Sequence, residues 1–471
     1  MPINIKITSF YPYFIALVSS IGGLLFGFNA GIITGALPFL KNSWGGLSVD
    51  QSNLIVISIL IGATFGALLS GKLSDIYGRK TMLFVTSIIY AIGAVLSGAA
   101  TSVLFLQVSR IILGAAMGIS SCVVPLYISE ISPLNKRGSL VSIFQLMITF
   151  GILFSIITNH IIANEFDPFS WRRMFYLGTI PAIIFFIGTF FLPETPRYLI
   201  MKGKIVEGKT ILRKLESDKK ADEIIEKLKS KNTRSFHIKK VWNSVLFITI
   251  GIMFIQQFIG VNTIIYFTPS LFSKLNNGNS AIDISLSIGI INVLATLIFI
   301  LLVDRVGRKP LFLIGLTGMS AALFFLGFIL TSNTIHSSSL QLISLLLILV
   351  YMVFFAISLG PLAWLVFSEV FPFKYRGFGM SIVAFSNWLF STFVTIGILK
   401  LSGIIGFPNE GLNGNDTKLS TFGQLFFVFA AIAVLGIIWG LKKLPETRGI
   451  SLEDIEDNWI KSKKSFELEK L

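Results

Sequence analysis

Six amide side chains lie within long apolar runs of the sequence, where polar groups are costly to bury. An amide carries both donors and acceptors, so a cluster of amides suits a ligand whose own groups both donate and accept hydrogen bonds. A single buried amide more often joins one helix to another. The six residues are Gln145, Gln256, Gln257, Asn262, Asn292 and Asn387.

The spacing of three of these amides requires a break in their helix. Gln256 and Gln257 are neighbours, whereas Asn262 follows five and six residues later, which is about 500–600° around an ideal helix. The three side chains can meet one ligand only if the helix bends or unwinds, and Gly260 is the natural place. Tyr266, four residues beyond Asn262, then shares its face.

Two tryptophans are candidates for an apolar surface beside a ligand. An indole combines a flat apolar face with one N–H donor. Trp364 follows Gly360-Pro361, where the proline frees backbone groups and permits a kink, and Trp388 directly follows Asn387. The alternative for either residue is ordinary packing or a place at the membrane interface.

The composition is that of a polytopic membrane protein. Of 471 residues, 53% are hydrophobic and 13% are charged, against about 25% charged residues in soluble domains. A soluble surface could not be covered with so little polar material, which excludes a cytosolic enzyme or a nucleic-acid reader. A membrane helix needs about 20 mostly apolar residues. Such runs lie near 11–37, 51–71, 81–100, 104–129, 139–163, 174–192, 243–268, 285–303, 311–332, 341–367, 379–402 and 421–441.

These runs predict an all-α membrane protein with twelve transmembrane helices in two six-helix repeats. We expect an N-terminal half over 1–196, a cytosolic linker with short helices over 197–242, a C-terminal half over 243–449 and a cytosolic tail over 450–471. Lys and Arg gather in the segments that share a side with both termini. The positive-inside rule therefore places both termini in the cytoplasm, beneath a bacterial inner membrane or a eukaryotic cell membrane.

Three charged motifs occur once in each half, in the same order, which indicates a duplicated unit. Such duplication is typical of transporters that move two halves about a midplane site. All three motifs fall at predicted cytosolic span ends, where acids and bases can bridge helices in one conformation and separate in another; the alternative is interfacial loop charges. The expected network comprises Asp75, Arg79, Glu130, Arg137, Glu194, Arg197, Asp304, Arg308, Glu369, Arg376 and Glu446.

Taken together, the motifs resemble the sugar porters of the major facilitator superfamily over about residues 12–456. The resemblance rests on Phe26-Gly-Phe-Asn29, Asp75-x-x-Gly-Arg-Lys80, Pro125-Leu-Tyr-Ile-Ser-Glu130, Pro193-Glu-Thr-Pro-Arg197, Gln256-Gln257-x-x-Gly260-x-Asn262, Gly360-Pro361-x-x-Trp364 and Pro445-Glu-Thr-Arg-Gly449.

The resemblance implies a monosaccharide substrate, a hexose or a pentose with glucose first, bound by the six amides with Trp364 and Trp388. It implies a gate at Tyr266, Phe267, Gly360 and Pro361; many relatives have a second tyrosine in place of Phe267. We expect no metal and no cofactor. The expected partners are the monosaccharide and the lipid bilayer, without nucleic acid, and a monomer suffices.

Asn29 bears on energy coupling. Away from the span ends the sequence holds Arg110 and no carboxylate. In the proton symporters of this family the position of Asn29 is an aspartate that takes up and releases the proton, whereas facilitative members carry asparagine, which cannot titrate. The prediction is a uniporter. Phe254–Phe258 and Gly449–Asp454 look more like the bacterial symporter branch, so a proton-coupled symporter, native or carrying an Asp-to-Asn change, is the alternative.

Three other classes fit the sequence less well. A non-transporting sugar sensor would need a long tail, and only 22 residues follow Gly449. A drug or cation exporter would normally carry a buried carboxylate for its cation. A membrane enzyme would need a catalytic cluster, and the three histidines lack nucleophile or metal-ligand spacing. We therefore expect a transporter and not an enzyme.

Overall fold

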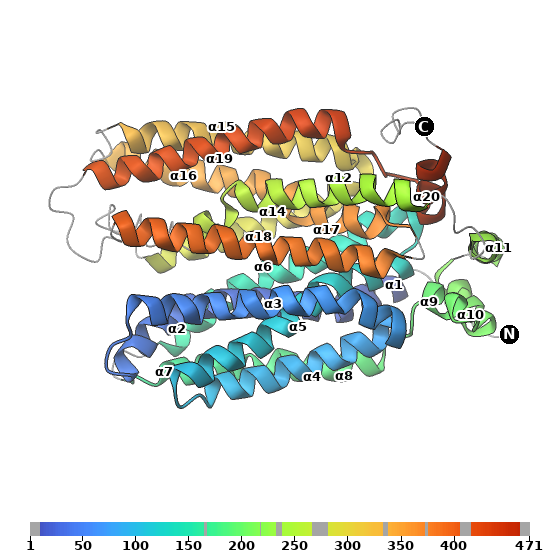
Figure 1. Cartoon of the computed structure of the whole chain (residues 1–471), viewed down its shortest axis with the longest axis horizontal. Helices are drawn as coiled ribbons and strands as arrows, with labels where there is room; N and C mark the ends of the chain where they lie inside the picture. Colours follow the sequence, from blue (N-terminus) through green and yellow to red (C-terminus); the bar gives the residue numbers. More distant parts are fainter. Residues whose placement is uncertain are drawn as a thin grey trace.

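The computed structural model describes residues 10–163, 167–216, 218–231, 238–265, 281–332, 338–372, 375–405 and 416–461. Every regular element among these residues is a helix, and twelve spans are long and apolar enough to cross a membrane. The expected all-α fold with twelve membrane helices is confirmed. The long helices run along the longest axis of the molecule (Figure 1).

An N-terminal bundle and a C-terminal bundle make up the membrane part. The N-terminal bundle consists of α1 (Tyr11–Ser19), α2 (Ile21–Ser43), α3 (Val49–Tyr77), α4 (Arg79–Gly98), α5 (Val103–Ile131), the 3-10 helix η1 (Leu134–Lys136), α6 (Arg137–Ile162), α7 (Ser170–Leu177) and α8 (Thr179–Phe190). The C-terminal bundle consists of α12 (Ile238–Phe258), α14 (Ala281–Val306), α15 (Arg308–Thr331), α16 (Ser338–Ala356), α17 (Leu359–Val370), α18 (Arg376–Ile405) and α19 (Asp416–Lys443).

Four short helices lie at one end of the two bundles. They are α9 (Pro196–Met201), α10 (Ile205–Leu215), α11 (Asp218–Lys231) and α20 (Leu452–Lys461), on the right in Figure 1. We call this the linker end. Several spans are built from consecutive helices, among them those that join α1 with α2, α7 with α8, and α16 with α17.

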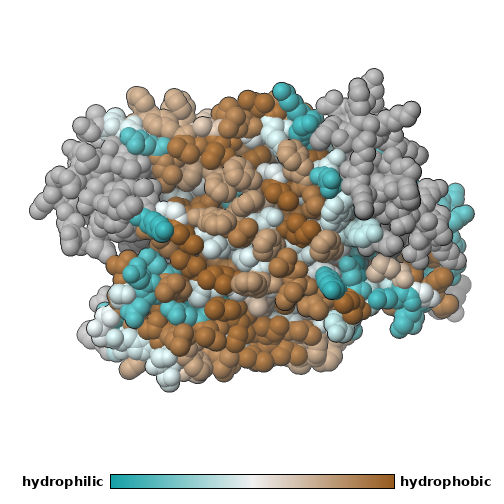
Figure 2. Space-filling model, in the orientation of Figure 1, coloured by the Kyte–Doolittle hydropathy of each residue, from teal (hydrophilic) through white to brown (hydrophobic). Residues whose placement is uncertain are grey.

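The surface and the packing both suit a bilayer. Figure 2 shows hydrophobic residues over the middle of the molecule and hydrophilic residues nearer its two ends. Within the N-terminal bundle, small residues let helices approach closely, as expected between membrane helices. A Cβ at Gly27 of α2 would overlap the carbonyl of Ile148 on α6, and one at Gly62 of α3 would overlap the carbonyl of Ile111 on α5. At these points the backbones of neighbouring helices lie in direct contact.

Two pairs of helices make the most extensive contacts between the bundles. Helix α3 packs against α18, and α6 packs against α14. Each pair joins one helix of the N-terminal bundle to one helix of the C-terminal bundle. The polar residues of interest lie along this boundary and at the linker end.

Candidate functional site

The break expected near Gly260 is present. Helix α12 ends at Phe258, Gly260 has φ +84°, and a further helical turn covers 261–265. Only glycine adopts such a backbone readily, and a Cβ there would also overlap the ring of Phe429. Because of the break, Asn262 reaches back and its Nδ2 donates to Gln257 Oε1 at 3.1 Å.

A chain of polar side chains continues from this pair onto α18. Gln257 Nε2 donates to Asn387 Oδ1 at 2.7 Å, and Asn262 Nδ2 also donates to Ser391 Oγ at 3.1 Å. Gln257, Asn387 and Ser391 are buried, while Asn262 is partly exposed. Three of the six predicted amides are therefore brought together, with a serine as the fourth member.

Gln256 connects the break in α12 to a second break, between α16 and α17. Its Nε2 donates to the carbonyl of Leu359 at 2.8 Å, the first residue of α17. In return Tyr351 of α16 donates its hydroxyl to the carbonyl of Ile259, beside Gly260, at 3.1 Å. The carbonyl of Ile259 lies at the end of α12, where the last carbonyls of a helix have no partner within that helix, and Tyr351 supplies the donor. Two hydrogen bonds thus connect the break in α12 to the break between α16 and α17.

Asn292 and Gln145 are the remaining amides, from α14 and α6. Both are buried, and Asn292 Oδ1 finds no hydrogen-bond partner among the described residues. A buried oxygen without a partner is costly. A hydroxyl group is the type of donor that this oxygen lacks.

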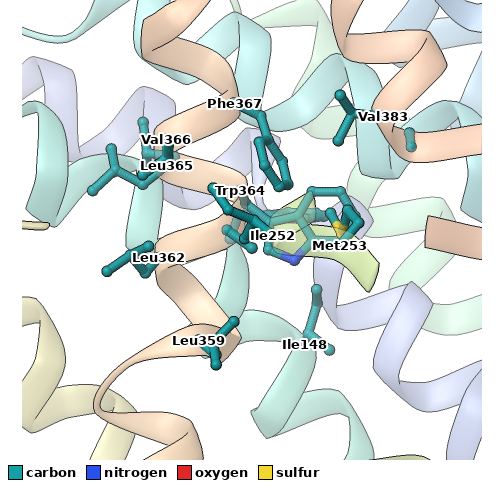
Figure 3. Packing of buried hydrophobic residues seen from close by; sticks show 14 of the residues in the cluster. Ile148, Ile252, Met253, Leu359, Leu362, Trp364, Leu365, Val366, Phe367 and Val383 are labelled. Carbon is teal, nitrogen blue, oxygen red and sulfur yellow. The ribbon is translucent and has the colours of Figure 1, made fainter. Parts of the chain in front are cut away.

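Trp364 lies on the boundary between the bundles. Its indole is surrounded by apolar side chains, among them Met253 of α12 and Ile148 of α6 (Figure 3). The ring of Phe144 on α6 meets it edge-on at 5.8 Å. Gly360 and Pro361 form the first turn of α17, three residues before Trp364. The tryptophan therefore contacts both bundles.

Trp388 also spans the boundary. Its Nε1 donates to Ser121 Oγ on α5 at 3.0 Å, and its ring lies 4.9 Å from that of Phe26 on α2. The two predicted site tryptophans thus link the C-terminal bundle to the N-terminal one beside the amides.

Asn29 and Arg110 each bond to backbone. Asn29 is 3% exposed, and its Nδ2 donates to the carbonyl of Leu25 in its own helix at 2.8 Å. Arg110 donates through Nε to the carbonyl of Ile55 on α3 at 2.8 Å, and its guanidinium lies 5.9 Å from the ring of Phe175. The position of Asn29 is therefore occupied by a buried, neutral amide.

The N-terminal copy of the charge network lies at the linker end. Arg79 pairs with Asp75 at 2.9 Å and with Glu130 at 3.3 Å. Glu130 Oε2 also accepts from the hydroxyl of Thr195 at 2.5 Å. Glu194 accepts the backbone N–H of Arg79 at 3.1 Å, so it caps the start of α4.

The C-terminal copy has the same geometry. Arg308 pairs with Glu369 at 2.8 Å and with Asp304 at 3.4 Å. Glu369 Oε2 accepts from the hydroxyl of Thr447 at 2.6 Å, and Glu446 accepts the backbone N–H of Arg308 at 3.0 Å. The motifs that repeat in the sequence therefore form the same ion pairs and hydrogen bonds in each half.

Further ion pairs join the two bundles at this end. Arg137 of α6 lies 3.8 Å from Glu369 of α17, and Arg197 of α9 pairs with Glu453 of α20 at 3.0 Å. Arg376 lies near Glu453 as well. Burial acts to raise the pKa of Glu453, but the attraction of Arg197 and Arg376 outweighs it and lowers the pKa to about 2. Helix α20 is thus held by a carboxylate that stays charged.

The comparisons with known proteins agree with this geometry. The chain matches the family described as "Sugar (and other) transporter" over residues 15–459. The chain belongs to this sugar transporter family. It is 36% identical to the galactose-proton symporter of Escherichia coli over 465 residues, which cover 97% of this chain and 96% of the relative. Its relatives carry sugars across membranes, so this sugar transporter is a multi-pass membrane protein and not an enzyme.

Two solved structures bear on its conformation. The proton:xylose symporter XylE bound to 6-bromo-6-deoxy-D-glucose superposes with a TM-score of 0.87 at 30% identity, covering 96% of this chain and 100% of that one. The inward-open xylose transporter XylE from E. coli covers 95% and 100% with a TM-score of 0.70 at 29% identity. The chain is therefore closer to the sugar-bound form, in keeping with the bonded linker end.

Several polar groups of this sugar transporter escaped the sequence predictions. Thr195 and Thr447 recur in the two Pro-Glu-Thr motifs, and that recurrence could have marked them. Ser121 and Tyr351 carry no such signal, because a lone hydroxyl in an apolar run is common, whereas Ser391 is marked by the resemblance as a position where some relatives have asparagine. The predicted gate residues Tyr266 and Phe267 lie outside the described residues.

Proposed function

We propose that this sugar transporter moves a monosaccharide, with a hexose such as glucose as substrate, by alternating access of a site between the two bundles. The bonded set Gln257, Asn262 and Asn387 carries the proposal, because its unused donors and acceptors match a ring of hydroxyls. Gln145 from the opposite bundle, Gln256 and Asn292 complete the polar contacts, and Trp364 and Trp388 supply apolar surface. The galactose relative and the glucose derivative bound to XylE support a hexose.

We further propose uniport, in which the sugar runs down its own gradient without an ion. Asn29 supports this, since a neutral amide bonded to its own helix cannot exchange a proton. Among the described spans, each acidic residue lies within about one helical turn of a helix end. Arg110, predicted with Asn29 as part of the coupling position, donates through Nε to the carbonyl of Ile55 on α3.

Proton-coupled symport is the second candidate. The galactose relative and XylE are both named proton symporters. Their similarity to this chain favours coupling of sugar transport to protons. A symporter built on this chain would need a proton-carrying group other than Asn29. The two candidates therefore differ in one measurable property, the response of sugar accumulation to a pH gradient.

We also propose an orientation in the membrane, a division into halves and a monomeric state. The linker end faces the cytoplasm, because the basic residues of the chain gather there and positive loops stay inside. The halves cover 1–196 and 243–449, joined by the linker over 197–242 and followed by the tail over 450–471. A single copy contains both bundles and the whole site, so a monomer is sufficient.

Transport in proteoliposomes tests both levels of the proposal. Purified protein should exchange labelled glucose or galactose in counterflow, and an imposed inward proton gradient should leave the final internal concentration at equilibrium. Accumulation above equilibrium under that gradient would refute uniport and support symport. If no hexose or pentose exchanges, sugar transport by this site is wrong.

A further inference from the structure

Ser391 occupies a specific place in the amide chain. It lies on α18, one helical turn after Asn387, and its side chain is 6% exposed. Its Oγ accepts a hydrogen bond from Asn262 Nδ2 at 3.1 Å. The same Nδ2 donates to Gln257 Oε1, also at 3.1 Å. Asn262 therefore stands between two acceptors, one from its own segment and one from α18.

This arrangement decides which end of the Asn262 amide is available. An amide nitrogen carries two hydrogens, and its oxygen only accepts. Both hydrogens of Asn262 are used, by Gln257 and Ser391, so the group left for a ligand is Oδ1. Among Gln257, Asn262, Asn387 and Ser391, Asn262 is the residue that is partly exposed.

The rest of the chain runs in a single direction. Gln257 accepts from Asn262 and donates to Asn387 Oδ1 at 2.7 Å, which leaves the Nδ2 of Asn387 as a donor. Amide orientation follows from the hydrogen-bond network around it. Without an acceptor at position 391, one hydrogen of Asn262 loses its partner, and the amide can turn to present either end.

We propose that Ser391 is a positioning residue for sugar selectivity: its hydroxyl oxygen holds the Asn262 amide with Oδ1 toward the ligand, so that this point of the site requires a hydroxyl that donates. The inference rests on the proposed sugar site and adds a rule to it. Fluorine accepts weakly and cannot donate, so a fluoro sugar at that ring position binds no better than the deoxy sugar.

The test measures dissociation constants on the full chain in lipid nanodiscs. The ligands are D-glucose and its series of monodeoxy and monofluoro derivatives. In the unaltered protein, one ring position should show an equal loss of affinity for the deoxy and the fluoro derivative. In Ser391→Ala, glucose should bind about ten-fold more weakly, because a buried donor is left unpaired. At that same position the fluoro derivative should now bind better than the deoxy derivative.

Matched variants separate positioning from packing. Ser386→Ala on α18 removes a buried hydroxyl that donates to its own helix, and the selectivity pattern should be unchanged. Thr and Val have nearly the same shape, so Ser391→Thr should keep the pattern of the unaltered protein and Ser391→Val should lose it. This pair still decides the matter if Ser391→Ala does not fold.

The outcomes separate the two levels of inference. If the unaltered protein binds no monosaccharide, the proposed function fails and this inference fails with it. If it binds glucose and Ser391→Ala or Ser391→Val keeps both the affinity and the fluoro-against-deoxy pattern, only the role of Ser391 is refuted. An equal loss of affinity for every sugar, with that pattern unchanged, also refutes it, because a packing defect would act in that way.

Discussion

Asp304 of the C-terminal bundle caps α6 of the N-terminal bundle at Gly138. Its Oδ1 accepts the N–H of Gly138 at 3.1 Å, and its Oδ2 accepts the N–H of Ser139 at 2.8 Å. In the other half, Asp75 lies against Gly377 in the first turn of α18, with its Oδ1 2.5 Å from where a Cβ would stand. A carboxylate at a helix N-terminus is stabilising. Each bundle therefore places an aspartate at the N-terminus of a helix in the other bundle, which holds the two bundles together at the linker end.

The first prediction concerns the glycine in each Arg-Gly pair. A Cβ at Gly138 would overlap Asp304 Oδ1, and one at Gly377 would meet Asp75. Gly138→Ala should weaken linker-end closure by about 1–3 kcal/mol, because Asp304 is displaced from its two backbone donors. Gly377→Ala should weaken it in the same direction, because the added methyl group displaces the Asp75 carboxylate from the start of α18. Hydrogen–deuterium exchange in the first turns of α6 and α18 should rise. Gly397→Ala on α18, where a Cβ meets nothing within 4 Å, is the control; equal exchange in all three variants would contradict the prediction.

The second prediction concerns pH and α20. The pKa of Glu453 is lowered from 4.5 to about 2, so its contribution to docking is complete above about pH 4.5 and is lost as the pH falls toward 2. Proteolytic protection of α20 should therefore be constant from pH 5 to 8. Glu453→Gln should abolish that protection at every pH, because Arg197 and Arg376 are left buried without their carboxylate. Protection that varies between pH 5 and 8 would argue against a charged Glu453.

The third prediction concerns the link between the two helix breaks. Tyr351→Phe removes the hydroxyl that serves the carbonyl of Ile259 and keeps the ring in place. The breaks in α12 and α16–α17 should then move less closely together, so the transport rate should fall several-fold while glucose affinity changes little. Stopped-flow uptake with equilibrium binding separates the two quantities. Thr249→Ala, which removes a buried hydroxyl bonded within α12, should change neither; an unaltered rate in Tyr351→Phe would show that the bond has no part in transport.

The sequence predicts the fold well because length and apolar content decide membrane helices directly. It also predicts the break at Gly260, since Asn262 cannot otherwise share a face with Gln257. It does not predict partners across helices: nothing in the order of residues places Ser391 beside Asn262, or Glu453 beside Arg197. Those contacts depend on how two bundles are rotated against each other, which hydropathy does not encode.

The fourth prediction concerns Asn29 and energy coupling. The side chain is buried and donates to the carbonyl of Leu25 in its own helix, so a carboxyl group fits the same space with one acceptor and one titratable proton. Asn29→Asp should make glucose uptake depend on pH, because a buried carboxyl favours the protonated form and changes the local charge when it ionises. The unaltered protein and Asn29→Ala should show a flat profile between pH 6 and 8 in the same proteoliposomes. If a pH gradient drives glucose accumulation by the unaltered protein, the proton is carried by another residue, and Asn29 does not decide the energy coupling.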